Sequence, residues 1–164
     1  MAVKPIPEGY RSVTPYLIVQ GASKLIDFAK LAFGAEETFR MPGPGGAIMH
    51  AEMRIGDSMV MLSDATPENP PMPIMIHLYV EDADRVYKRA LAAGASSLRE
   101  PADQFYGDRS AGVKDAFGNQ WWLATHIEDV SPQELQKRAA AMGQPAGGRG
   151  VSAPSGACRA FLQP

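Results

Sequence analysis

Two stretches of this sequence have the same pattern and decide the fold. Residues 17–35 read LIVQGASKLIDFAKLAFGA, and residues 78–95 read LYVEDADRVYKRALAAGA. Each stretch begins with β-branched, aromatic or other apolar residues typical of a strand, and then places apolar residues at helical spacing. Each ends at a Gly-Ala pair, and a glycine just past the last periodic residue is typical of a helix C-terminus. The chain therefore contains the same strand-helix unit twice.

The similarity continues beyond the helices. In both halves the helix is followed by three strand-like runs separated by turn residues, a pattern that predicts an antiparallel meander. In the first half these runs are 36–41, 47–55 and 58–63, and in the second they are 95–100, 109–114 and 120–126. The offset between the halves stays at about 60 to 62 residues, and self-similarity at one period indicates a structural repeat. The sequence therefore predicts a tandem βαβββ fold.

The boundaries of the repeat follow from composition. The first module is expected over residues 10–64 and the second over 74–130, joined by a linker at 65–73 that is rich in proline. The first strand is predicted over 12–19, and Pro15 within it favours an edge position because proline cannot donate to a sheet ladder.

The chain beyond the second module divides into two parts. A helix is predicted over 131–142, because Ser131 followed by Pro132 and Glu134 has the pattern of a capping box. Residues 143–164 are rich in glycine and proline without periodicity, and we expect a flexible tail there.

Composition and charge exclude several classes of protein. The 164 residues are 45% hydrophobic and 21% charged, which is typical of a folded globular protein. The net charge of −2 offers no positive field for sequence-independent nucleic-acid binding. No apolar run is long enough to cross a membrane, and the N-terminus lacks the apolar core of a secretory signal. These features predict a cytoplasmic protein that binds neither nucleic acid nor membrane.

The cysteine count and short motifs exclude further chemistry. Cys158 is the only cysteine, which excludes an intramolecular disulfide, a zinc site made of thiolates and a cysteine redox pair. No G-x-S-x-G motif is present, and the glycines at 43, 45 and 46 lack the strand-turn-helix setting of a phosphate loop.

The amino-acid sequences of several segments resemble those of a known superfamily. The segments are TPYLIV (14–19), IDFAKLAFGAEE (26–37), IMHAEMRIGDSMVMLSD (48–64), LYVEDAD (78–84) and YGDRSAGVKDAFGNQWWLATHIEDVS (106–131). With the tandem βαβββ order, they resemble the vicinal oxygen chelate superfamily, and within it the PhnB-like glyoxalase/bleomycin resistance branch. The resemblance implies an α+β fold in which the modules form a cupped eight-stranded mixed sheet with the helices outside. It also implies a homodimer, because chains of this superfamily commonly pair their modules.

The resemblance also implies where a metal ion would lie. In metal-dependent members, four side chains from the first and last strands of both repeats bind a divalent ion. The corresponding residues in this chain are expected to be Thr14, Met61, Met75 and Trp122. None is a good ligand for a hard or borderline ion, which prefers imidazole or carboxylate. We therefore expect the usual metal site to be lost and no cofactor to be bound.

Strand alternation suggests a different metal site. If the side chains of one parity pack under the helices, then His50, Glu52 and His77 face the concave side of the sheet. Two imidazoles and a carboxylate can bind iron or zinc, so a displaced divalent metal site is one hypothesis. The other is that His50 and Glu52 form a hydrogen-bonded polar pair and that His77 is a satisfied cleft histidine.

The same alternation predicts the lining of a ligand-binding cleft. The expected lining residues are Tyr16, Met61, Met75, His77, Tyr79, Tyr106, Arg109 and Trp122. Aromatic and methionine side chains suit a flat or irregular apolar ligand, and Arg109 suits an anionic group. Alternatively, Arg109 pairs with Asp108 or with the turn at Asp115. His126, at the end of the last strand, is interpreted as a surface histidine.

Three functions from different classes follow from these residues. The first is a protein that binds a small, partly apolar molecule in the cleft without the usual metal. The second is a metal-dependent lyase, transferase or dioxygenase that uses His50, Glu52 and His77. The third is an interaction or structural unit whose cleft is filled by its own side chains.

Overall fold

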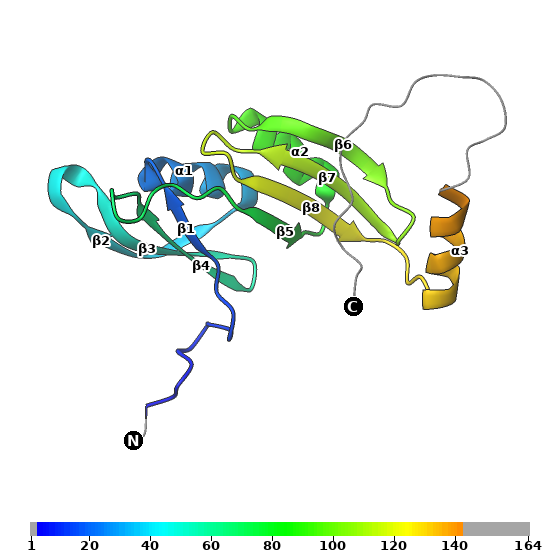
Figure 1. Ribbon diagram of the computed structural model, residues 1–164, viewed down its shortest axis with the longest axis horizontal. Coiled ribbons are helices and arrows are strands. Elements are labelled where there is room, and N and C mark those ends of the chain that lie inside the picture. The colour runs from blue at the N-terminus through cyan, green and yellow to red at the C-terminus, as the bar shows by residue number, and fades with distance from the viewer. Residues whose placement is uncertain (1–2, 143–164) are drawn as a thin grey trace. The chain divides into compact units, whose positions relative to one another are not determined.

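The computed structural model describes residues 3–142 and contains two modules with the same element order (Figure 1). The first comprises β1 (Tyr16–Val19), α1 (Ala22–Phe33), β2 (Glu36–Pro42), a 3₁₀ turn (Pro44–Gly46), β3 (Ile48–Ile55) and β4 (Ser58–Asp64). The second comprises β5 (Met75–Tyr79), α2 (Ala83–Ala92), β6 (Ser96–Asp103), β7 (Asp108–Lys114) and β8 (Gln120–His126). The helix α3 (Pro132–Met142) follows the second module. The tandem βαβββ prediction is confirmed.

Each module forms its own four-stranded mixed sheet. The strand order is β1-β4-β3-β2 in the first sheet and β5-β8-β7-β6 in the second. The first strand of each module pairs in parallel with the last, and the other neighbours are antiparallel. Among residues 3–142 no strand of one sheet pairs with a strand of the other, so the expected eight strands form two ladders rather than one. The edge position predicted for the first strand is confirmed.

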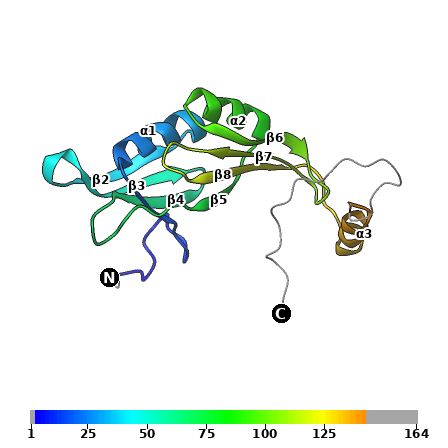
Figure 2. The same cartoon turned by 45° about the horizontal axis from the view of Figure 1, so that its top comes forward.

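The two helices lie on one side of the sheets and contact each other (Figure 2). The ring of Phe33, at the end of α1, lies 4.6 Å from the ring of Trp121 on β8, measured between centroids. Arg89 of α2 donates two hydrogen bonds, of 3.1 and 2.9 Å, to the carbonyl oxygen of Leu31. These contacts join the modules through their helices and leave the opposite faces of the sheets uncovered by them.

The helix α1 occupies the predicted residues because both of its ends are satisfied. Gly34 adopts the left-handed conformation that a C-terminal cap needs, with φ of 71°. At the other end, the Asp64 carboxylate accepts from the amides of Gly21 and Ala22, at 2.7 and 2.8 Å, and from that of Ile48 at 2.7 Å. Burial raises the pKa of Asp64, and the hydrogen bonds from the three amides lower it. The amides have the larger combined effect, so the pKa lies below its ordinary value.

In the second module, the buried residue Asp115 holds the β7–β8 turn together. Its carboxylate accepts from the amides of Phe117 and Asn119, from the Asn119 side chain and from the indole Nε1 of Trp121, each at 2.9 Å. Asp115 is 4% exposed, so every one of these bonds is shielded from water. The carboxylate therefore satisfies polar groups that would otherwise be buried without partners.

Some predicted boundaries need correction. The strand predicted over 12–19 starts only at Tyr16, and the Pro15 carbonyl accepts from the amide of Met61 just before the ladder begins. The strand predicted over 95–100 is longer and covers β6, with register shifts within its pairing to β7. The other predicted elements agree within one or two residues.

The C-terminal part forms a separate unit. α3 starts where the capping pattern predicts, and the Ser131 hydroxyl accepts from the amide of Glu134 at 3.2 Å. Within the described residues, α3 belongs to a different unit from residues 3–130. The flexible tail expected over 143–164 lies outside the described residues. Among the residues described, no helix is long and apolar enough to span a membrane.

Candidate binding face

Each sheet has a face that the helices do not cover, here called the open face. The register of the strands places one row of four residues across each open face at the same level. The first row is Phe39, Glu52, Met61 and Tyr16, and the second is Arg99, Gly112, Trp122 and His77. These rows contain half of the predicted cleft residues, namely Tyr16, Met61, His77 and Trp122, and the two rows differ in chemistry.

The open face of the first module carries a chain of polar contacts. The Tyr16 hydroxyl lies 3.2 Å from the His50 Nδ1, and the His50 Nε2 lies 3.3 Å from a carboxylate oxygen of Glu52. Phe39 borders this chain, with its ring centroid 6.2 Å from that of His50. The prediction that His50 and Glu52 form a hydrogen-bonded pair is therefore confirmed.

Tyr10, from the segment before β1, adds to this face. Its hydroxyl is buried and has no hydrogen-bond partner within the described part of the chain. Burial, together with the adjacent Glu52 carboxylate, raises the pKa of Tyr10 to about 12. The hydroxyl therefore remains protonated over the physiological range, beside the Glu52 carboxylate.

The open face of the second module carries a stacked aromatic ring. The Trp122 ring covers Gly112, where an added Cβ atom would lie only 3.0 to 3.1 Å from three ring carbons. The Arg99 guanidinium carbon lies 4.6 Å from the centre of the Trp122 ring, in a cation–π arrangement, and Arg99 also donates to the Ser110 hydroxyl. Trp122 Nε1 and Arg99 Nε are buried without a partner among residues 3–142.

Large apolar side chains are exposed on both open faces. Met75 is 67% exposed, Tyr79 is 63% exposed and Tyr16 is 40% exposed. The His77 ring packs against Tyr79, with 4.9 Å between the ring centroids. Along β1, a groove of about 410 Å³ opens beside Tyr16 and Ile18 and continues to the linker at Asn69. The open faces thus offer aromatic surface and a groove of ligand size.

The ladders show which residues surround the expected metal positions. Tyr16 lies beside Met61, and His77 lies beside Trp122. Thr14, expected at a metal position, lies two residues before Tyr16 and precedes β1, and Met75 lies two residues before His77 on β5. The four expected residues Thr14, Met61, Met75 and Trp122 are poor ligands for a hard or borderline ion, and of their two ladder neighbours only His77 is a good one. The donor set does not fit the usual metal site.

The alternative ligand set is only partly assembled. His50 and Glu52 are in contact on the first sheet, whereas His77 lies on β5 of the second sheet and packs against Tyr79. Across residues 3–142 no group of three or more His, Cys, Asp or Glu side chains is placed to hold a metal ion. One chain therefore does not bring the three predicted ligands together.

Arg109 is engaged by carboxylates of its own module. It forms a bidentate ion pair with Asp84 of α2 and a 2.8 Å ion pair with Asp103 of β6. The alternative expectation, pairing with Asp108 or Asp115, is wrong because β7 directs the side chain toward α2. Arg109 lowers the pKa of Asp84 through the hydrogen bond and its charge. Nearby, the Tyr106 ring packs edge-on against Phe105, with 5.3 Å between centroids.

One cluster of titratable residues was missed by the sequence analysis. Asp108 is 4% exposed and accepts from the Tyr79 hydroxyl at 3.1 Å, and His126 Nδ1 lies 2.8 Å from its other oxygen. The ring also contacts Asp129 through Nε2 at 3.1 Å. These carboxylates, Asp108 first, raise the pKa of His126, and the bond to Asp108 raises the pKa of Tyr79. His126 is on the surface as expected, but it is paired.

One of the missed residues has a signal in the sequence. Gly112 is an isolated glycine within a predicted strand, and such a glycine often marks a close approach by another group. Arg99, Tyr10 and the buried Asp108 had no such signal, because their contacts depend on pairing between strands that are distant in sequence.

The comparisons with known proteins agree with this architecture. The profile of the Glyoxalase/Bleomycin resistance protein/Dioxygenase superfamily matches residues 12–123. The chain belongs to this superfamily. A relative from Mycobacterium bovis, an uncharacterized protein, is 38% identical over 143 residues, which cover 80% of this chain and 94% of the relative.

Solved structures with the same fold include several branches of the superfamily. TioX from a Micromonospora species has a TM-score of 0.61 at 24% identity, covering 71% of this chain and 99% of TioX. TnmS3, an antibiotic-binding protein from a Streptomyces species, has a TM-score of 0.55 at 23% identity. The match covers 71% of this chain and 97% of TnmS3. A PhnB protein from Bacillus cereus has a TM-score of 0.55 at 18% identity. The match covers 70% of this chain and 99% of the PhnB protein. At these identities the likeness shows the fold alone.

Proposed function

We propose that this protein binds a small, partly apolar molecule on its open faces. The observation that supports this most strongly is the position of Trp122, an aromatic ring with an unpartnered Nε1 at a place where metal-dependent relatives need a ligand. Aromatic surface combined with a few unpaired donors is typical of small-molecule sites. TnmS3, which has the same fold, is an antibiotic-binding protein.

We further propose that two copies of the chain complete the site. Met75 and Tyr79 are among the most exposed large apolar side chains, and they lie on the open face of the second sheet. Contiguous exposed apolar groups of this kind mark interaction surfaces. An open face of one copy placed against an open face of the other encloses the aromatic rings and excludes water, as the superfamily's paired modules imply.

The dimer is tested by its mass in solution. Analytical ultracentrifugation of the full chain is expected to give twice the chain mass of 17.6 kDa. Met75→Glu is expected to shift the population to monomers, because it places a charge in the apolar contact. Leu31→Glu is the matched control, since Leu31 is equally exposed at 66% but lies on the helix side. A monomeric wild-type chain contradicts the proposal.

Ligand binding is tested with an aromatic probe. The fluorescence of 8-anilinonaphthalene-1-sulfonate, which rises in apolar sites, is titrated against the wild type and the variant Tyr16→Ala/Tyr79→Ala. We expect the variant to bind the probe at least fivefold more weakly, because it removes two exposed rings of the open face. Leu31→Ala is expected to bind like the wild type. Equal binding by all three proteins contradicts a site on the open face.

The metal hypothesis is tested separately. We propose that the usual site holds no metal, because Met61 and Trp122 replace the imidazole or carboxylate ligands that such a site needs. Elemental analysis is performed on untagged protein incubated with Fe, Co, Ni, Mn and Zn and then desalted. About one ion per chain, lost in His50→Ala/His77→Ala, would instead support the metal-dependent enzyme, with ligands contributed by both copies.

A further inference from the structure

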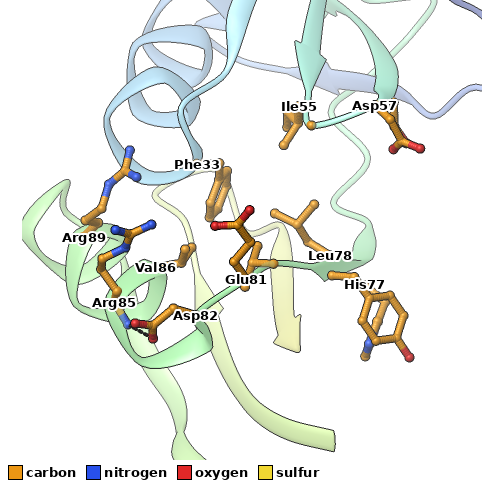
Figure 3. Close-up of a pocket in the computed structure, with 14 residues that line it drawn as sticks. Phe33, Ile55, Asp57, His77, Leu78, Glu81, Asp82, Arg85, Val86 and Arg89 are labelled. Atoms are coloured by element: carbon orange, nitrogen blue, oxygen red, sulfur yellow. Dashed lines mark hydrogen bonds between the residues drawn. The ribbon is translucent and has the colours of Figure 1, made fainter. Parts of the chain in front are cut away.

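A groove between the two modules borders the open face, and His77 and Tyr79 belong to its lining. Its volume is about 500 Å³, within the range of about 300–1,000 Å³ that small-molecule sites usually have. Its walls come from the end of α1, the β3–β4 turn, β5 and the first turns of α2 (Figure 3). In this view His77 points away from Phe33 and Arg85, which face the groove.

The lining of the groove is apolar on one side. Phe33 of α1 is half-buried, and Val86 of α2 and Ile55 of β3 are 7% and 5% exposed. Leu78 of β5 faces the same space (Figure 3). Two of these four residues come from each module. An apolar group placed here removes surface from water against both modules at once.

Two opposite charges project into the same groove. Figure 3 shows the Arg85 guanidinium and the Glu81 carboxylate facing its centre, near Phe33. Both side chains are exposed, and neither has a hydrogen-bond or ion-pair partner among residues 3–142. Arg89 is different, because its guanidinium turns to α1 and binds the Leu31 carbonyl.

The backbone explains why Arg85 and Glu81 do not neutralise each other. Asp82 is the N-cap of α2, with an extended φ of −145°, and its carboxylate accepts from the amide of Arg85 at 2.9 Å. Glu81 therefore precedes the helix, and the i,i+4 geometry that joins charged pairs on a helix surface does not apply to it. The groove therefore holds Arg85 and Glu81 unpaired beside its apolar wall, and its other charged lining residues are Asp57, Asp82 and Arg89.

We propose that this groove binds a free α-amino acid with an apolar side chain. The guanidinium of Arg85 donates two parallel hydrogen bonds to the α-carboxylate, and the Glu81 carboxylate accepts hydrogen bonds from the α-ammonium group. The side chain of the amino acid packs against Phe33, Leu78 and Val86. Both side chains are exposed in the free protein, so a ligand with only one charge would form only one of the two ion pairs and would bind more weakly.

The test uses the full chain labelled with ¹⁵N and follows its amide signals by NMR. L-phenylalanine and L-leucine are the probes, and 3-phenylpropionate and phenethylamine are analogues that lack the ammonium and the carboxylate respectively. We expect saturable shifts at Leu78 and Val86 with at least one amino acid, and at least tenfold weaker binding of both analogues. The absence of saturable shifts with both amino acids, or equal binding of either analogue, overturns the proposal.

Single variants identify the role of each charge. Arg85→Gln and Glu81→Gln are each expected to weaken binding of the amino acid at least tenfold, and in Arg85→Gln phenethylamine should bind as well as L-phenylalanine. Lys88→Gln and Glu68→Gln are matched controls, because both positions are exposed and neither lines the groove. Unchanged binding in Arg85→Gln, with an unchanged melting temperature, refutes the site. Variants of the open face, such as Tyr16→Ala, should leave this binding unaltered.

Discussion

The two modules share one topology but carry opposite chemistry at equivalent places. On the third strand of each sheet, Glu52 of the first module corresponds to Gly112 of the second. Glu52 continues a polar chain to His50, whereas the bare backbone at Gly112 lets the Trp122 ring lie on the sheet. One position in the row therefore decides whether an open face is polar or aromatic.

The same comparison holds at the helix N-termini. At the end of the last strand, the carboxylate of Asp64 accepts three backbone amides in the first module. At the equivalent place in the second module, the Thr125 hydroxyl accepts one amide, from Ala83 at 2.9 Å, and donates to the Val80 carbonyl. The β3–β4 turn has no counterpart to the buried Asp115. The modules thus use different polar groups to hold the same backbone.

The largest expected difference between the modules concerns their turns. Asp115→Ala should lower the free energy of unfolding by about 3 kcal/mol or more, because it leaves buried donors, including Trp121 Nε1, without an acceptor. Asp57→Ala in the equivalent turn should change it by about 0.5 kcal/mol or less, since the side chain of Asp57 is 85% exposed. Urea denaturation measures both, and similar losses would contradict the comparison.

The second-largest difference is expected between the polar groups that cap the N-termini of α1 and α2. Asp64→Ala is expected to cost about 2–3 kcal/mol through the three amides it frees, and Thr125→Ala about 1 kcal/mol. The pKa of Asp64 is lowered in the folded state, so its stabilisation is present above its unfolded pKa of about 3.9 and is lost as the pH falls through the folded value. Urea denaturation at pH 7 and pH 3 should show a smaller Asp64→Ala effect at pH 3. A pH-independent cost would show that the charge is not involved.

In the second module, adding one methyl group at Gly112 should disturb the row of residues on the open face. Gly112→Ala is expected to displace the Trp122 ring, to cost about 1–3 kcal/mol and to move tryptophan emission to longer wavelength. Glu52→Ala in the first module should leave tryptophan emission unchanged, because both tryptophans lie in the second module. Fluorescence spectra and urea denaturation test both variants, and an unchanged spectrum of Gly112→Ala would show that the glycine is not needed for the ring.

The smallest effect concerns the end of β8, where His126 has no counterpart because the equivalent residue of the first module is Ala65. The pKa of His126 is raised by Asp108 and Asp129, so the pair stabilises the fold fully below the unfolded pKa of about 6.5. This contribution is lost as the pH rises through the folded value. An NMR titration should show the raised pKa of His126, and Asp108→Asn should lower it. An unperturbed pKa in the wild type would remove this difference between the modules.

Local patterns predicted most of the elements because their causes are local. The apolar period and the glycine at position 34 define α1, and turn residues separate the strands of the meander. The start of β1 was predicted too early, because Pro15 delays the strand. The pairing of Tyr16 with Met61 and of His77 with Trp122 could not be predicted either, because a two-residue shift keeps the same alternation of faces.

The sequence predicted several residues of the open faces but not the contacts that their side chains make. Tyr16, His77, Tyr79 and Trp122 do lie on the open faces, since strand alternation places every second side chain there. The partners of Arg109 were missed, because Asp84 lies on α2 and reaches β7 only when the helix packs on the sheet. Arg99 was missed in the same way, as its stacking on Trp122 requires β6 and β8 to lie two strands apart.

The sequence by itself determined the repeat, the elements and the superfamily, because these depend on residue periodicity and turn chemistry that neighbouring residues provide. Only the tertiary structure decided that the eight strands form two sheets and that Trp122 lies on Gly112 beneath Arg99. It alone placed Arg85 and Glu81 in a groove between the modules. Each of these facts joins residues far apart in the chain, and such contacts depend on how the helices and sheets pack.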